Sequence, residues 1–307
     1  GEKDSPDYSE SSNFAVSWSH SQDSKARPGT SFRASVNFAS PSNNKYNSDN
    51  IQQALQNQMS SSISYSKTWT GMSMSVNASH SQNSRDSSYA ITFPNITFTV
   101  NRFFPFKRKN GVGSEKFYEK ISLSYNSSMQ NKINFKVKEL KDMNIMDRLQ
   151  NGMTHNFAIG LPSFTILNYI QAAPSISYGM NWYFREQTKR YDPETDQVIT
   201  EMTPQFSRFG ISQTYSAGIS FSTRIYGLFN FGKDKKVQAI RHMISPQLGI
   251  NLKPELGTAM NGYRTYTYID KNGKEKSVEY NKYAGNLTSP PGRGRNAGLT
   301  FSVGNNI

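Results

Sequence analysis

Four histidines are the side chains best suited to chemistry, because the chain has no cysteine. His20, His80, His155 and His242 are far apart in the sequence, and no pair has the i, i+2 or i, i+4 spacing of a preformed metal site. The missing thiol excludes a cysteine nucleophile and a thiolate metal site. No Ser/His/Asp set can be assembled either. We therefore predict no catalytic residue, no metal site and no cofactor, and we predict that the protein is not an enzyme.

Positive charge is the next candidate for a function. The chain has 35 Lys and Arg residues against 22 Asp and Glu, a net charge of +13. The basic clusters at 107–109 and 233–236 fall between predicted strands rather than on one face, so nucleic acid is not predicted as a partner. The segment 291–295 only superficially resembles a phosphate-binding loop, because no strand precedes it and no helix start follows it. It is expected to be a flexible basic loop.

Several arginines fall inside or at the ends of predicted strands instead. They are Arg33, Arg102, Arg185, Arg224 and Arg241. On a polar strand face they could line a water-filled lumen and attract an anionic ligand. The alternative for each of them is an ion pair with Asp or Glu, or plain solvation.

The segment 239–250 carries the most specific of these predictions. Alternation places Arg241, Ser245 and Gln247 toward a lumen and His242 away from it. Pro246 cannot donate a hydrogen bond within a sheet, so it predicts a break in strand pairing. Arg241 would then be free to meet an anionic ligand. A bulge with a purely structural arginine is the alternative.

The elements that position these side chains are predicted to be strands, because apolar residues recur at every second position along most of the chain. Residues 31–40, 96–101 and 215–222 are examples, and their intervening positions are mostly Ser, Thr, Asn and Gly. Hydrophobic residues make up only 35% of the chain, yet aromatics reach 13%. This combination is typical neither of a soluble domain nor of a disordered chain. The predicted fold is all-β, a transmembrane antiparallel up-and-down β-barrel with apolar residues toward lipid.

The chain has room for about eleven strands of such a barrel, an estimate from the spacing of the alternating segments. Residues 1–307 are expected to be part of one barrel domain and a fragment of a longer protein. No signal peptide is recognised at the start of the sequence. The long polar links 41–57, 187–204 and 254–296 are predicted to lie on the cell surface. Within the last link, the Asn272–Gly273 pair predicts a hairpin. Residues 138–150 are predicted to form one or two helical turns.

Three segments resemble the LptD family of lipopolysaccharide-assembly outer-membrane proteins. They are Ala239–Ile250 with its Arg-His-x-Ile-x-Pro core, Asn101–Lys107, and Phe301–Asn306 with its Asn-Asn pair. The resemblance implies a large barrel in the Gram-negative outer membrane that works with a plug lipoprotein in its lumen and a periplasmic bridge protein that delivers lipopolysaccharide. This chain would be the middle of the barrel, without the periplasmic jellyroll and the closing strands. The family's disulfides between jellyroll and barrel are in doubt, because this chain has no cysteine.

The leading hypothesis is therefore a non-catalytic translocon that assembles lipopolysaccharide at the cell surface. Its polar lumen would carry head groups, and acyl chains would leave sideways into the outer-membrane lipids. A passive porin or another outer-membrane transporter shares the composition and differs only at the Arg-His-x-Ile-x-Pro segment. A soluble secreted β-sandwich or adhesin is the other alternative, and detergent-dependent extraction would separate it from a barrel.

Overall fold

The fold comes from a computed structural model that describes residues 14–23, 25–39, 58–83, 85–139, 141, 144–231 and 238–306. Its strands are β1 Ala15–Ser21, β2 Thr30–Ala39, β3 Gln58–Trp69, β4 Met72–Asn83, β5 Ser88–Phe103, β6 Ser122–Lys136, β7 Gln150–Gly160, β8 Phe164–Ile166, β9 Ile170–Tyr183, β10 Gln187–Asp192, β11 Gln197–Met202, β12 Gly210–Ser222, β13 Ile225–Asn230, β14 Ala239–Lys253, β15 Tyr263–Ile269, β16 Glu275–Asn281 and β17 Asn296–Asn306. Short helical segments are η1 Phe117–Lys120, η2 Val137–Glu139, α3 Ile145–Arg148 and η3 Ala259–Asn261.

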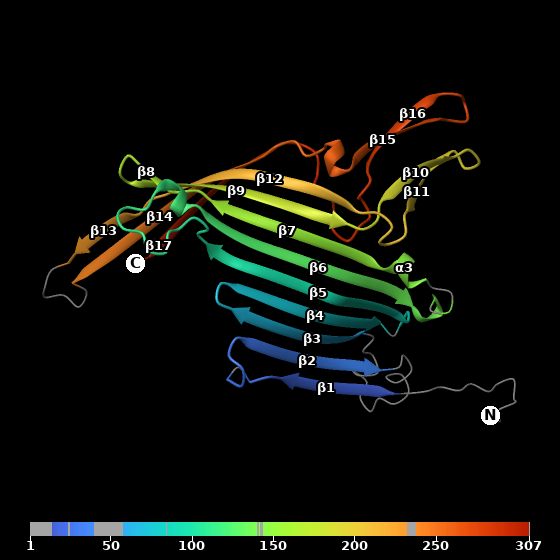
Figure 1. Ribbon diagram of the computed structural model, residues 1–307, viewed down its shortest axis with the longest axis horizontal. Coiled ribbons are helices and arrows are strands. Elements are labelled where there is room, and N and C mark those ends of the chain that lie inside the picture. The colour runs from blue at the N-terminus through green and yellow to red at the C-terminus, as the bar shows by residue number, and fades with distance from the viewer. Residues whose placement is uncertain are drawn as a thin grey trace.

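Thirteen of the strands form one antiparallel sheet, in which neighbours in the sequence are mostly neighbours in space (Figure 1). These strands occupy eleven positions across the sheet. The strand β8 continues the line of β7 along β9, and β13 continues the line of β12 along β14. The predicted all-β antiparallel fold is thus confirmed, and the sheet has thirteen strands in eleven positions where about eleven strands were expected.

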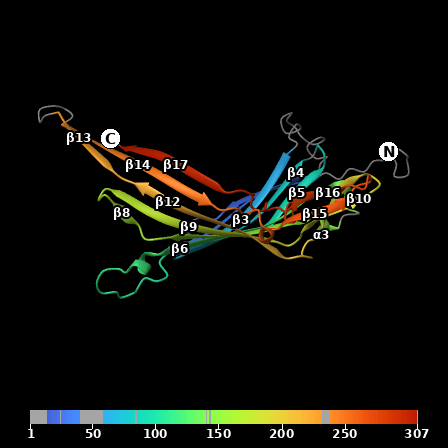
Figure 2. The same cartoon turned by 90° about the horizontal axis from the view of Figure 1, so that it is seen from above.

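The sheet is open rather than closed. Seen from above it bends into a broad curve (Figure 2), and β1 and β17 are its two free edges among the described residues. A closed barrel therefore stays a prediction. None of the helices in the described part of the chain is long and apolar enough to cross a membrane.

One face of the sheet carries apolar residues across all its strands. The strand pairs show this, because residues that pair in antiparallel strands lie on the same face. Val76 pairs with Ile96, Phe157 with Tyr178, and Ile219 with Ile250. A shift of register at 93–94 in β5 moves the apolar set from odd to even positions, which keeps this face continuous with β4 and β6. Many of its large side chains stay exposed, among them Trp18, Ile176 and Phe301. We call this side the apolar face and the other side the polar face.

The links lie at the two ends of the strands. One end carries the turns after β1, β3, β5 and β8, and the other end carries the turns after β4, β6, β9 and β14. The hairpins β10–β11 and β15–β16 lie at the second of these ends (Figure 1). The hairpin predicted around Asn272–Gly273 and the helical turns predicted at 138–150 are confirmed. The predicted surface link 41–57 and the basic cluster 233–236 lie outside the described residues.

Candidate functional site

The polar face is the part of the sheet with the capacity to bind a polar ligand. Ser, Thr, Asn and Gly dominate it, and the described strands of the 13-stranded sheet contain no Asp or Glu. The charged side chains that these strands place on it are all cations: Arg33, Arg102, Lys132, Lys136, Arg241 and Lys253. Short hydroxyl and amide groups donate and accept hydrogen bonds, and unopposed cations attract anions. This face is therefore suited to a hydroxyl-rich anionic ligand.

A hollow of about 700 Å³ lies at the middle of the polar face, across β5, β6, β7, β9 and β12. Its wall includes Asn126, whose amide donates to the Thr99 hydroxyl at 2.9 Å. Gly179 keeps the floor low, since a Cβ there would lie 2.6 Å from the Thr214 hydroxyl oxygen. The hollow thus depends on a small residue at a crowded point of the sheet.

The strand β14 places the predicted inward residues on the polar face. Arg241 pairs with Leu228, and its guanidinium carbon lies 4.9 Å from the centre of the Tyr226 ring. Ser245 and Gln247 follow on the same face and pair with Gly304 and Ser302 of β17. Arg241 therefore stacks on an aromatic ring and forms no ion pair among the described residues.

Pro246 lies opposite the point where β12 ends and β13 begins. Pairing runs from Ser222 with Gln247 to Ile225 with Ile244, and the two positions between them are unpaired. The Thr223 N–H still donates to the Pro246 carbonyl at 3.3 Å. Proline has no N–H to return a bond to Thr223, so the ladder is interrupted on this side. On its other side Pro246 pairs with Val303 without interruption.

Arg185 and Arg224 lie in different surroundings. Arg224 is exposed in the two-residue gap between β12 and β13. Arg185 lies beyond the end of β9, is 7% exposed, and donates from Nη2 to the Gly285 carbonyl at 3.2 Å. Its guanidinium is therefore covered by a loop. Whether either side chain faces a lumen stays a prediction.

A layer of loops covers the polar face at one end. We call residues 184–209 and 254–295 the cap. The Tyr283 ring stacks on Tyr183 with centroids 4.2 Å apart, and the Asn181 amide donates to the Ser289 carbonyl. Asn261 is 1% exposed and accepts the Gln213 N–H at 2.7 Å, where β12 has not yet met β14. The cap thus closes a gap in the sheet and narrows the polar face.

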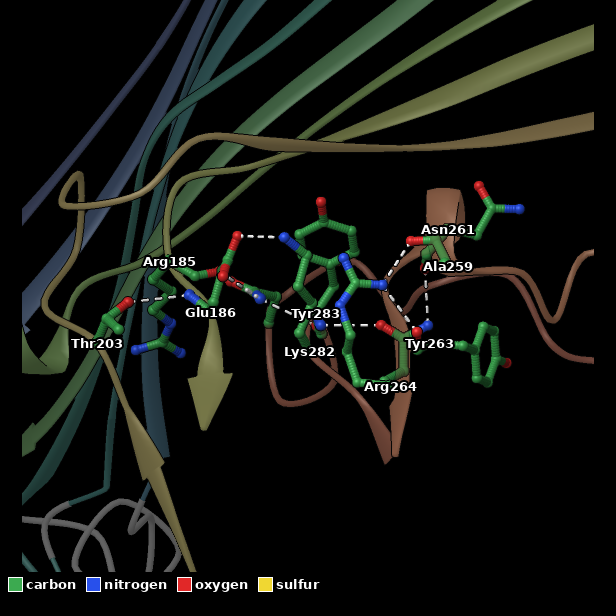
Figure 3. A network of polar contacts seen from close by, with 11 residues as sticks. Arg185, Glu186, Thr203, Ala259, Asn261, Tyr263, Arg264, Lys282 and Tyr283 are labelled. Carbon is green, nitrogen blue, oxygen red and sulfur yellow. Dashed lines mark hydrogen bonds and ion pairs between the residues drawn. The ribbon is translucent and has the colours of Figure 1, made fainter. Parts of the chain in front are cut away.

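The two parts of the cap also hold each other (Figure 3). Lys282 pairs with Glu186 at 2.7 Å, and the Gln187 N–H donates to the Lys282 carbonyl. Farther out, the Tyr191 and Tyr268 rings stack at 4.7 Å. Sequence reasoning did not find these residues, because partners 77 to 96 positions apart leave no local pattern.

A family model described as LptD protein matches residues 1–307. The chain belongs to the LptD family. No curated protein and no solved structure matches it. Membership connects the chain with lipopolysaccharide transport and assembly, with the outer membrane, and with a transport component rather than an enzyme. Among the described residues, no group of three His, Asp or Glu side chains is placed to hold a metal ion.

Two of the segments that resemble the LptD family meet in space. The strand β14, with the Arg-His-x-Ile-x-Pro sequence, pairs from Met243 to Lys253 with β17, which carries the Asn-Asn pair. The ring nitrogen Nε2 of His242 forms a hydrogen bond with the Asn305 side chain on the apolar face. This bond gives one polar atom of each side chain a partner on a face that is otherwise mostly apolar.

Glu119 organises the link between β5 and β6, outside the sheet. Its carboxylate accepts from Arg108 Nη2 at 3.0 Å and from the Lys116 N–H at 2.6 Å. Arg108 is the main cause that lowers the pKa of Glu119 to about 2, and the Lys116 N–H adds to it. The ionised carboxylate therefore stabilises this LptD link fully above its ordinary pKa of 4.5, and this stabilisation is lost as the pH falls toward about 2.

Glu119→Gln is expected to loosen this link and to speed its cleavage by pepsin in detergent micelles several-fold at pH 4. As the pH is lowered to about 2, the wild-type chain loses the same ionic contacts. The ratio of the two cleavage rates should therefore fall toward one. A ratio that does not change with pH would show that the Glu119 charge does not hold the link.

Proposed function

We propose that this chain forms part of an outer-membrane β-barrel translocon that assembles lipopolysaccharide at the cell surface. In this proposal residues 1–307 belong to one barrel domain, and Arg241, Ser245, Gln247, Arg185 and Arg224 face its lumen. The break opposite Pro246 loosens the wall where a partner or a moving strand approaches. A plug lipoprotein and a periplasmic bridge protein are the proposed partners.

The observation that carries the proposal is the contrast between the two faces of the sheet in a member of the LptD family. The polar face combines hydroxyls, amides and unopposed cations, a chemistry suited to sugars and phosphates. The apolar face leaves large aromatic and aliphatic side chains exposed, as lipid-facing barrel strands do. Head groups would travel along the first face while acyl chains leave into the bilayer.

The long links 184–209 and 254–295 support one orientation of the sheet. Barrels of the outer membrane have short periplasmic turns and longer outer loops. We therefore propose that the cap lies at the cell surface and that the opposite ends of the strands, with the Arg108–Glu119 contact, lie in the periplasm. The links 187–204 and 254–296 would then be surface loops.

A photo-crosslinking amino acid at Ser177 tests this proposal, with Ile176 as the matched control. Both side chains are exposed and adjacent in β9, but Ser177 lines the central hollow and Ile176 belongs to the apolar face. We expect pulse-labelled lipopolysaccharide to crosslink to Ser177 early and to disappear from it during a chase. The signal at Ile176 should not show this transient. Absence of lipopolysaccharide crosslinks at Ser177 would contradict transport along the polar face.

A further inference from the structure

A second hollow on the polar face lies at the strand ends opposite the cap. It has a volume of about 590 Å³ and is formed where β5 ends, β6 begins, β7 ends and β9 begins. Its volume falls within the range of about 300–1,000 Å³ that is usual for ligand pockets. Two cations, Arg102 and Lys120, lie in its wall, and no acidic residue does.

The acids nearest in the sequence are already engaged with other cations. Glu119 accepts hydrogen bonds from Arg108, and Glu115 forms an ion pair with Lys107 at 2.9 Å. Within the described residues, neither Arg102 nor Lys120 forms an ion pair. The hollow therefore contains two positive charges that form no ion pair with a carboxylate of the described chain.

The rest of the wall supplies hydrogen-bonding groups of a neutral kind. Its polar members are Ser122, Ser163, Gln171, Ser175, Ser220 and Ser222. Gly160 forms part of the floor, and a Cβ there would collide with the Ser122 hydroxyl oxygen and would lie 4.0 Å from Arg102 Nη2. The absence of a side chain at Gly160 thus lets the Ser122 hydroxyl and the Arg102 guanidinium lie close together in the wall of the hollow.

Arginine, lysine and hydroxyl groups together suit a phosphate better than a carboxylate. A guanidinium offers a planar fork of donors, an ammonium adds a point charge, and hydroxyls donate to the remaining phosphate oxygens. We infer that the Arg102–Lys120 hollow binds a phosphate group of an anionic glycolipid head group. This inference rests on the proposed function. It names the chemical group that the polar face recognises at the periplasmic ends of the strands, where the ligand would enter.

The test measures binding to the purified full-length protein in neutral detergent micelles. The probes are diphosphorylated lipid A, the same lipid after enzymatic dephosphorylation, and inorganic phosphate. A hydrogen bond to a charged group contributes roughly tenfold or more to binding. Arg102→Gln and Lys120→Gln should each weaken binding of the phosphorylated lipid by roughly tenfold and leave binding of the dephosphorylated lipid unchanged.

Lys132→Gln is the matched control, because it removes one positive charge from the polar face at a position outside the hollow. An equal loss in this variant would overturn the inference in favour of a diffuse charge effect. Equal binding of both lipids by the wild-type protein would also overturn it, while transient crosslinks at Ser177 would leave the proposed function standing. If only inorganic phosphate depends on Arg102 and Lys120, the assignment to a glycolipid head group is wrong. A difference in gel mobility between unheated and heated samples verifies that each variant is folded.

Discussion

Ile219→Arg is expected to prevent the sheet from assembling in the outer membrane. Ile219 lies on the apolar face of β12, between Pro174 of β9 and Ile250 of β14. An arginine at the midplane of a barrel's lipid face costs roughly 2–4 kcal/mol. Such a cost is a large part of the stability of a typical domain, which is about 5–15 kcal/mol. The amount of heat-modifiable, folded protein in outer-membrane fractions measures the effect.

Ser220→Arg is the control for this change, one residue farther along the same strand. Ser220 is exposed on the polar face, where its hydroxyl donates to the Ala173 carbonyl at 3.4 Å. An arginine there can stay in water, so we expect nearly normal amounts of folded protein. Equal amounts of folded protein for the two variants would contradict the assignment of the apolar face to lipid.

Gly210→Val is expected to detach the cap from the polar face. Gly210 is buried at the start of β12, and a Cβ there would lie 2.5 Å from Cε1 and 2.6 Å from Cζ of Tyr283. These are ring atoms stacked on Tyr183, so the ring must move as a whole. Overpacking of this kind costs roughly 1–3 kcal/mol, which corresponds to a factor of about 5–150 in the population of the detached loop.

Two measurements on intact cells follow the cap. Detachment should raise sensitivity to a large hydrophilic antibiotic and should speed proteolysis of residues 254–295. Gly298→Val is the control, because nothing lies within 4 Å of a Cβ at Gly298. If both variants keep the outer membrane tight while folded protein is present in normal amounts, the cap does not obstruct passage along the polar face.

The alternation of apolar and polar residues was sufficient to predict the all-β fold. Segments such as 72–80 and 215–222 place side chains of one kind on one face, and their pairing in the sheet follows that pattern. The Asn272–Gly273 hairpin was equally local, since Gly273 has a φ of 76° that a turn of this kind requires. The family resemblance likewise came from short segments, and the match over residues 1–307 confirmed it.

Other features became visible only in the tertiary structure. The pairing of His242 with Asn305 depends on the register between β14 and β17, and the interruption at Thr223 depends on Pro246 lying directly opposite. Neither can be predicted from one strand alone, because register is a property of two strands.

The sequence by itself therefore determined the two faces of the sheet, the positions of its strands and the polar, basic character of one face. The tertiary structure decided which parts of that polar face stay open. The cap reaches it through contacts such as Tyr183 with Tyr283 and Arg185 with Gly285, between residues about 100 positions apart. Local periodicity reflects only which way neighbouring side chains point. Where a long loop folds depends on the space left by residues such as Gly210, and that space exists only after the strands have assembled.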